Sequence, residues 1–294
     1  MAKARQIRKR VAAVKNIRTI TKTMEMIASA RYRRAHDHAV SARPYTDRVT
    51  DLVGDLLAEG GEKLDHPLLH ENEELKKDVL LVLTSNRGLC GGYNASVLAL
   101  AIERFTQLTK AGYQIALHVA GKRGIQYLRS VGLEIAQTYT ELDFLPSYAQ
   151  IGRIAHGLMQ QFLDGKISGL EVAYMQYLSS GQQQPAISQI LPLSGIEPPK
   201  RLEPVGRTVG VYDFSPSAET ILRNLLPATV RLRLWQCFLD ASVTEQMMRS
   251  ASMRAASDNA DEMIEELSLK HNRMRQAQIT SELAEIMGGR AALE

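Results

Sequence analysis

The chain has 294 residues, of which 45% are hydrophobic and 23% charged, the composition of a folded protein of one or two domains rather than a disordered chain. No stretch approaches the roughly 18 consecutive apolar residues of a transmembrane helix, and the basic N-terminus lacks the apolar segment of a signal peptide. The two cysteines, Cys90 and Cys237, lie in different segments, which argues against a disulfide framework. We therefore expect a cytoplasmic protein.

The net charge of +4 conceals a strong segregation of charge. Residues 1–34 hold eleven basic residues against one acidic residue, Glu25, whereas residues 240–270 hold seven acidic residues against three basic ones. A basic and an acidic segment can pair lengthwise, which is one interpretation of this pattern. Binding of nucleic acid by the basic segment is the other.

The sequence predicts a long helix over residues 2 to about 58, because apolar residues recur there at steps of three and four. This predicted stripe consists of Ile7, Val11, Val14, Ile17, Ile20, Met24 and Ile27. Pro44 should kink or locally unwind the helix, since proline removes a backbone donor. Gly60-Gly61 is a typical C-terminal stop, so we assign residues 1–60 to this helix and 61–77 to a linker.

Residues 78–192 have a different character, in which short apolar runs alternate with amphipathic segments. The expected strands cover 79–84, 114–120, 133–138 and 170–178, with an edge strand over 186–191, and the expected helices cover 95–109, 122–130 and 146–163. This alternation predicts a small, mostly parallel α/β (Rossmann-like) domain. Residues 193–217 are rich in proline and predict an irregular connector.

Residues 218–294 predict a second long helix, since neither proline nor glycine occurs between Leu234 and Glu285. Its predicted apolar seam consists of Leu234, Phe238, Ala241, Met248, Ala251, Ala255, Met263, Leu267 and Met274. A continuous helix from 219 to 287 would be on the order of 100 Å long at 1.5 Å per residue. Such a helix is a rod rather than part of a compact domain.

Neither long helix can bury its apolar seam alone, and the two carry opposite charge. The economical fold class is therefore α/β with an antiparallel coiled coil of the two terminal helices and the α/β domain inserted between them. The C-terminal helix is the longer one, so its end, residues 279–294, should extend past its partner.

The sequence contains no convincing set of catalytic, cofactor-binding or metal-binding residues. The loop from Ser85 to Gly92 follows a strand as phosphate-binding loops do, but it lacks G-x-G-x-x-G and Gly-Lys-Ser/Thr, so a tight structural turn is favoured. Cys90 lacks a recognisable histidine partner and is expected to be a buried thiol. His66 and His70 stand near three glutamates without forming a closed ligand set.

Three segments resemble the signature segments of the gamma-subunit family of F-type ATP synthases. They are IRTITKTMEMIASA at 17–30, NRGLCGG at 86–92 and NRMRQAQITSELAEI at 272–286. The resemblance covers essentially the whole chain, including the order helix, α/β domain, helix. The third segment is the most specific, because polar residues recur there at fixed places on a helix otherwise free to vary.

The resemblance implies a central-stalk rotor subunit that couples proton (or sodium) flow through a membrane rotor ring to ATP synthesis or hydrolysis at the beta subunits. It implies alpha, beta, epsilon and rotor-ring subunits as partners, no cofactor, no nucleic acid and no transmembrane segment of its own. The chain itself would be non-catalytic and peripheral, at the cytoplasmic face of the cell membrane.

Residue by residue, the resemblance also implies contact sites. The positions that match contacts with the alpha/beta ring are Lys22, Met24, Glu25, Arg275, Gln276, Thr280, Glu282 and Glu285. The segment 286–293 matches an end seated in an apolar collar at the top of the ring. Tyr212 and Asp213 match, in a weaker alignment, positions that contact the rotor ring and epsilon.

Two alternatives remain open at this point. A basic coiled-coil protein could bind nucleic acid through residues 1–34, although only Tyr32 and the nearby Tyr45 supply aromatic rings for stacking. A nucleotide-using α/β enzyme would have to bind its nucleotide within residues 78–192.

Overall fold

The computed structural model describes residues 2–60, 66–70, 75–142, 144–193 and 217–291. The chain forms two compact units, one of residues 1–30 with 249–294 and the other of residues 31–248. We call the first unit the helix pair and the second the body. Helix α1 (Ala2–Gly60) and helix α5 (Ala218–Ala291) each contribute to both units.

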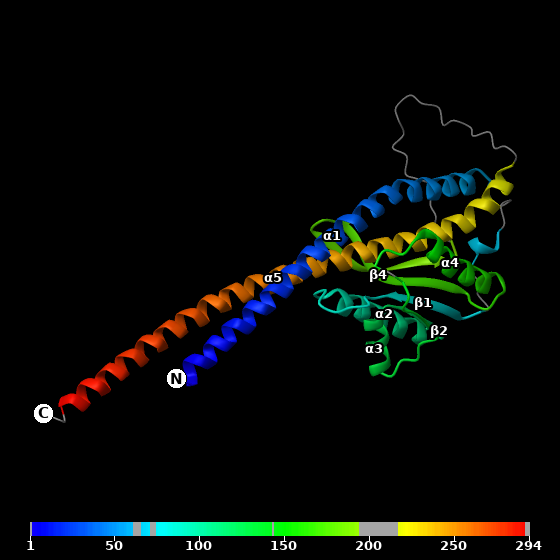
Figure 1. Ribbon diagram of the computed structural model, residues 1–294. Helices are drawn as coiled ribbons and strands as arrows, with labels where there is room; N and C mark the ends of the chain where they lie inside the picture. The colour runs from blue at the N-terminus through cyan, green and yellow to red at the C-terminus, as the bar shows by residue number, and fades with distance from the viewer. Residues whose placement is uncertain (1, 61–65, 71–74, 143, 194–216, 292–294) are drawn as a thin grey trace. The chain divides into compact units, whose positions relative to one another are not determined.

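The body contains a five-stranded sheet (Figure 1). Its strands are β1 (Lys77–Leu83), β2 (Gln114–Ala120), β3 (Gln137–Tyr139), β4 (Gly169–Ser179) and β5 (Gln182–Leu191), in the spatial order β3-β2-β1-β4-β5. All pairs are parallel except β4 with β5, which form an antiparallel hairpin. The predicted mostly parallel α/β domain is therefore confirmed.

Both faces of the sheet are buried, as the near-continuous apolar character of β1 requires. Successive side chains of a strand point to opposite faces, so Leu80 and Val82 pack with α2 (Tyr93–Lys110) and α3 (Lys122–Ser130). Val79, Leu81 and Leu83 pack on the other face.

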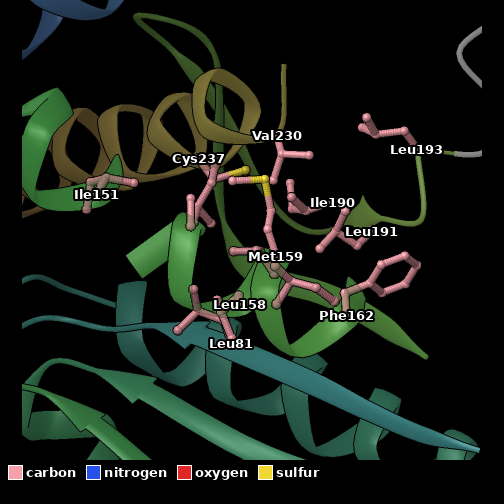
Figure 2. Packing of buried hydrophobic residues seen from close by; sticks show 14 of the residues in the cluster. Leu81, Ile151, Leu158, Met159, Phe162, Ile190, Leu191, Leu193, Val230 and Cys237 are labelled. Carbon is pink, nitrogen blue, oxygen red and sulfur yellow. The ribbon is translucent and has the colours of Figure 1, made fainter. Parts of the chain in front are cut away.

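On that second face, α4 (Tyr148–Leu163) and segments of α1 and α5 cover the sheet. Figure 2 shows Leu158 and Met159 of α4 beside Val230 and Cys237 of α5, with Leu191 of β5 close by. This cluster is the larger part of the core. The two long helices are thus anchored in the body by apolar packing against the sheet.

Most of the predicted elements of the body are found close to their predicted bounds. The strand 114–120 and the helix 122–130 match residue for residue. The predicted strand over 133–138 is largely wrong, because β3 pairs with β2 only over Gln137–Tyr139. Leu133 and Ile135 instead pack against the core from the loop that follows α3, which explains their apolar character. The edge strand begins earlier than predicted, at Gln182.

The two prolines inside the long helices do not interrupt them. Helix α1 continues through Pro44, so the predicted local unwinding is wrong. Pro44 is exposed, and water can therefore satisfy the carbonyl that loses its helical donor. Helix α5 starts at Ala218 and continues through Pro227.

Candidate subunit-interaction surface

The helix pair is antiparallel. Thr21 of α1 hydrogen-bonds to Ser257 of α5 with 2.7 Å between the hydroxyl oxygens, and Arg18 forms an ion pair with Asp261. The α5 number rises as the α1 number falls, which is the register of antiparallel helices. This register joins the basic and the acidic segments lengthwise, as the charge pattern predicted.

The seam of the helix pair follows a seven-residue spacing and combines apolar residues with small or polar ones. On α1 the residues Ile7, Val14, Thr21 and Ala28 are buried or half-buried. On α5 the corresponding buried residues are Met253, Ser257 and Ala260. Small side chains allow the two helix backbones to approach closely, and a strict seven-residue repeat is the signature of a coiled-coil seam.

The predicted seam of α1 is wrong at Ile17, Ile20 and Ile27, whereas Met24 is half-buried. Ile17, Ile20 and Ile27 are 54%, 59% and 50% exposed, because the true seam lies one residue later along the helix. One residue corresponds to a turn of about 100° around the helix axis, which moves these isoleucines to the outer surface. On α5, Ala251, Ala255 and Met263 are likewise exposed rather than buried.

The C-terminal end of α5 carries a second exposed apolar stripe. Ile279, Leu283, Ile286 and Met287 follow one another at helical spacing, and the last two are 70% and 72% exposed. The antiparallel register places Ala2 opposite roughly residue 276, so this stripe lies beyond the start of α1. Within the helix pair, Figure 1 shows the end of α5 extending past the N-terminus of α1, as predicted.

The predicted contact residues of α1 lie on and beside the seam. Lys22 is exposed and its ammonium group lies 3.0 Å from a carboxylate oxygen of Glu25. Met24 and Glu25 are half-buried. Glu25 therefore offers only part of its carboxylate to a partner, whereas Lys22 is available on the outer surface.

The predicted contact residues of α5 lie further along the same unit. Arg275, Gln276, Thr280 and Glu282 are exposed, and the Thr280 hydroxyl donates to the carbonyl of Gln276. The side chain of Glu285 lies outside the described residues. In the antiparallel register, Lys22 is opposite roughly residue 256, about 30 Å along α5 from Arg275. The structure thus keeps the two predicted sets apart, at two levels of the helix pair.

Tyr212 and Asp213, the predicted contacts of the rotor ring, lie outside the described residues, as does most of the proline-rich connector.

The polar groups of the loop between β1 and α2 form hydrogen bonds with one another and with the start of α2. The Ser85 amide donates to the side-chain oxygen of Asn94 at 2.9 Å, and the Ser85 hydroxyl donates to the carbonyl of Arg87 at 2.7 Å. Cys90 is buried and accepts a hydrogen bond from the Asn94 amide. This loop is a tight structural turn, as expected. Among the described residues, no group of three His, Cys, Asp or Glu side chains could hold a metal ion.

A buried polar cluster near the end of β4 was not anticipated from the sequence. Asp240 of α5 accepts from Gln236 at 2.9 Å and lies 3.5 Å from Arg43 of α1. Burial raises the pKa of Asp240 to about 6, although the hydrogen bond from Gln236 and the charge of Arg43 oppose this shift. Burial also raises the pKa of the Cys237 thiol to about 12, which leaves this cysteine unreactive. Only the interruption of an apolar helix face by Asp240 could have pointed to this cluster.

A family model described as ATP synthase matches residues 3–293 of the chain. The chain is 42% identical over 296 residues to the ATP synthase gamma chain of Rhodopirellula baltica, and the match covers 100% of both chains. The chain belongs to the ATP synthase gamma chain family. It is also 38% identical to the gamma chain of Saccharopolyspora erythraea, with 100% of this chain and 98% of the relative covered.

Solved structures show the same fold in this family. A chain of the Euglena gracilis mitochondrial ATP synthase, solved as OSCP/F1/c-ring, has a TM-score of 0.62 at 14% identity, covering 99% of this chain and 95% of that chain. A chain of the central stalk and c-ring of the Tetrahymena thermophila enzyme has a TM-score of 0.55 at 18% identity, covering 81% of this chain and 99% of that one. Membership of the gamma chain family gives no support to nucleic-acid binding as an explanation of the basic segment. Across the part of the chain that is described, none of the helices is both long and apolar enough to cross a membrane.

Proposed function

We propose that this member of the gamma chain family is the central-stalk rotor subunit of a proton-translocating F-type ATP synthase. It couples rotation of a membrane rotor ring to ATP synthesis or hydrolysis at the beta subunits. Coupling of this kind is carried by rigid-body rotation, because each beta subunit makes different contacts with the shaft at each angle. The chain is non-catalytic and is held peripherally at the cytoplasmic face of the cell membrane as part of the complex.

The observation that carries this proposal is the pattern of exposure on the helix pair. Large apolar side chains such as Ile17, Ile20 and Ile286 are 54%, 59% and 70% exposed. A lone soluble rod with this surface would aggregate, so the pattern favours a rod enclosed by partners. A ring of alpha and beta subunits around the helix pair would cover these side chains.

We further propose the contacts at two levels of the ring. Lys22, Met24 and Glu25 contact it at one level, and Arg275, Gln276, Thr280, Glu282 and Glu285 contact it at the other. The exposed stripe from Ile279 to Met287 contacts an apolar collar. Tyr212 and Asp213 contact the rotor ring and epsilon. The α/β domain spans residues 78–192, between the terminal coiled-coil segments 1–60 and 218–294.

The test is the assembled complex with gamma residues changed at one of these levels. Arg275→Ala removes a charged donor that makes strong hydrogen bonds to carboxylates, so ATP synthesis driven by a proton gradient should fall by roughly tenfold. Arg273→Ala is the matched control, because Arg273 is equally exposed on the same helix and no contact is proposed for it. Removal of residues 270–294 should abolish coupled synthesis.

Purification of the chain from its cells tests the rotor function itself. If the full chain is isolated from its cells as a free monomer without alpha or beta subunits, it is not a rotor subunit. Equal synthesis rates for Arg275→Ala and Arg273→Ala would remove the proposed contact at Arg275 while leaving the rotor function in place.

A further inference from the structure

Three side chains of α1 make directional contacts with one residue of the sheet, Tyr177 near the end of β4. The hydroxyl of Tyr32 lies 3.5 Å from the Tyr177 hydroxyl. The His36 ring lies edge-on to the Tyr177 ring with 5.6 Å between their centroids, and Arg43 donates to the Tyr177 carbonyl at 3.3 Å. Tyr177 therefore fixes α1 at points three turns apart along the helix.

Helix α5 reaches the same stretch of β4. Asp240 of α5 is the ion-pair partner of Arg43, with 3.5 Å between a guanidinium nitrogen and a carboxylate oxygen. Two residues before Tyr177 on β4, the carbonyl of Met175 accepts from the Thr244 hydroxyl of α5 at 3.2 Å. Both long helices are thus hydrogen-bonded to the last residues of one strand.

Apolar packing lies beside these polar contacts, which are themselves part-buried. Tyr177 is 6% exposed and packs with Ala35 and Ala39 of α1 and with Leu239 and Val243 of α5. The alanines leave room for the tyrosine ring against the helix surface. The hydrogen bonds are part-buried, and the Arg43 side chain is 42% exposed, so what they add to the packing is mainly a defined direction.

The remaining core between the sheet and the helices is of another kind. The cluster around Leu158, Val230 and Leu191 is apolar, and apolar contact is non-directional. This apolar packing holds the helices on the sheet. It opposes sliding and twisting of the helices less than hydrogen bonds between defined partners do. The contacts at Tyr177 are the ones that set the rotational position of α1 and α5 against the sheet.

We propose that Tyr177 is a positioning residue for torque transfer, which locks the sheet of the body to both long helices against twisting. The inference rests on the proposed rotor function. Helices α1 and α5 both run from the body into the helix pair, so torque applied to the body passes through their segments in residues 31–60 and 218–248. Tyr177, Arg43 and Asp240 form the joint at which those segments are held.

The first experiment uses the full-length chain with the double substitution Tyr177→Phe and Arg43→Met. Each substitution keeps the apolar part of the side chain and removes its polar end. The matched control is Tyr139→Phe with Arg48→Met. The Tyr139 hydroxyl bonds to His118 inside the sheet, at 3.2 Å from its ring nitrogen, and Arg48 is exposed on the same helix as Arg43.

Hydrogen exchange by mass spectrometry reads out the joint. Loss of two hydrogen-bonding groups should speed amide exchange by roughly 10-fold in residues 32–46 of α1 and in the hairpin around Ser180. The control should leave these segments unchanged. Unchanged exchange in the double variant would overturn the proposal, because Tyr177 would then not hold α1.

The second experiment measures protons pumped per ATP hydrolysed in the assembled complex. The double variant should keep its hydrolysis rate and lose roughly half or more of its pumping against a gradient, since a loosened joint yields under load. The control should keep both. A purely structural role would lower assembly without changing this ratio. Faster exchange with an unchanged ratio would overturn the proposal and leave the rotor function, which the Arg275 and deletion variants test separately.

Discussion

The body and the helix pair differ in how much of their large apolar side chains they bury. In the body, large apolar residues such as Leu80 and Leu81 are fully buried on the two faces of one sheet. In the helix pair, Ala28 and Ala260 are buried, whereas Ile20 is 59% exposed. The body is therefore stabilised mainly by its own apolar core. The helix pair instead leaves much of its apolar surface exposed.

This contrast follows from the physics of each unit. A sheet covered on both faces removes large apolar areas from water, at roughly 25 cal/mol per Å². Two helices joined through alanine, serine and threonine bury little area, so much of their stability as a rod must come from their helical propensity and from partners. Each prediction below changes one side of this contrast, and they are ordered from the largest expected effect to the smallest.

Leu81→Ala should have the largest effect, because Leu81 is fully buried in the core between the sheet, α4 and α5. A leucine-to-alanine change at such a site costs about 2–5 kcal/mol of the free energy of unfolding through lost burial and a cavity. Urea unfolding of the full chain followed by circular dichroism measures it. A loss below about 1 kcal/mol would contradict the account of the body as a tightly packed unit.

Asp240→Asn should stabilise the body more at neutral than at acid pH. Because the folded-state pKa of Asp240 is raised from 3.8 to about 6, its protonation stabilises the fold below pH 4, and this contribution is lost as pH rises through 6. Two pKa units correspond to roughly 3 kcal/mol, so the variant should gain up to about that amount on the wild-type chain between pH 4 and pH 7. The asparagine oxygen can still accept from Gln236.

Unfolding curves at several pH values test this prediction. The buried His118, whose pKa burial lowers to about 4, titrates in both proteins, and its contribution cancels in the difference between them. A difference that stays constant from pH 4 to pH 7 would show that Asp240 keeps an ordinary pKa.

The body could be predicted largely from the sequence, whereas the joint and the seam could not. Strand β1 is a continuous apolar run between polar residues, and glycines close several turns, so periodicity and punctuation agree there. In α1 the large apolar residues Ile17, Ile20 and Ile27 are exposed, and the seam is marked only by the seven-residue spacing from Ile7 to Ala28. The most hydrophobic face of this part of α1 is therefore not its buried face.

The contact residues illustrate the same limit. Nothing in the spacing of Lys22, Arg275 and Thr280 distinguishes them from other exposed residues on a long helix, and only the family resemblance singles them out. The joint at Tyr177 depends on the meeting of residues more than 130 positions apart in the sequence, from Arg43 to Tyr177. A local pattern cannot carry such information.

Ala28→Leu should destabilise the helix pair by about 1–3 kcal/mol, because Ala28 is buried in the seam and a larger side chain would force the two helices apart. Hydrogen exchange in residues 5–30 and 249–275 of the full chain should become faster, while exchange in β1 should not change. Ala13→Leu is the matched control, since Ala13 is exposed on the same helix. Equal exchange in both variants would mean that the seam is not where the buried residues place it.

Ile20→Ala should have the smallest effect on the chain and a clear effect on its assembly. Ile20 is exposed, and a substitution at such a site usually changes the free energy of unfolding by no more than about 0.5 kcal/mol. Inside a ring of partners the same side chain would be buried, so its loss should weaken binding to alpha and beta subunits by roughly 1 kcal/mol or more, about fivefold in the dissociation constant. Urea unfolding and a binding titration on one preparation separate the two effects. If Ile20→Ala instead unfolds the chain as strongly as Leu81→Ala does, the outer isoleucines belong to a core within the chain and not to a surface for partners.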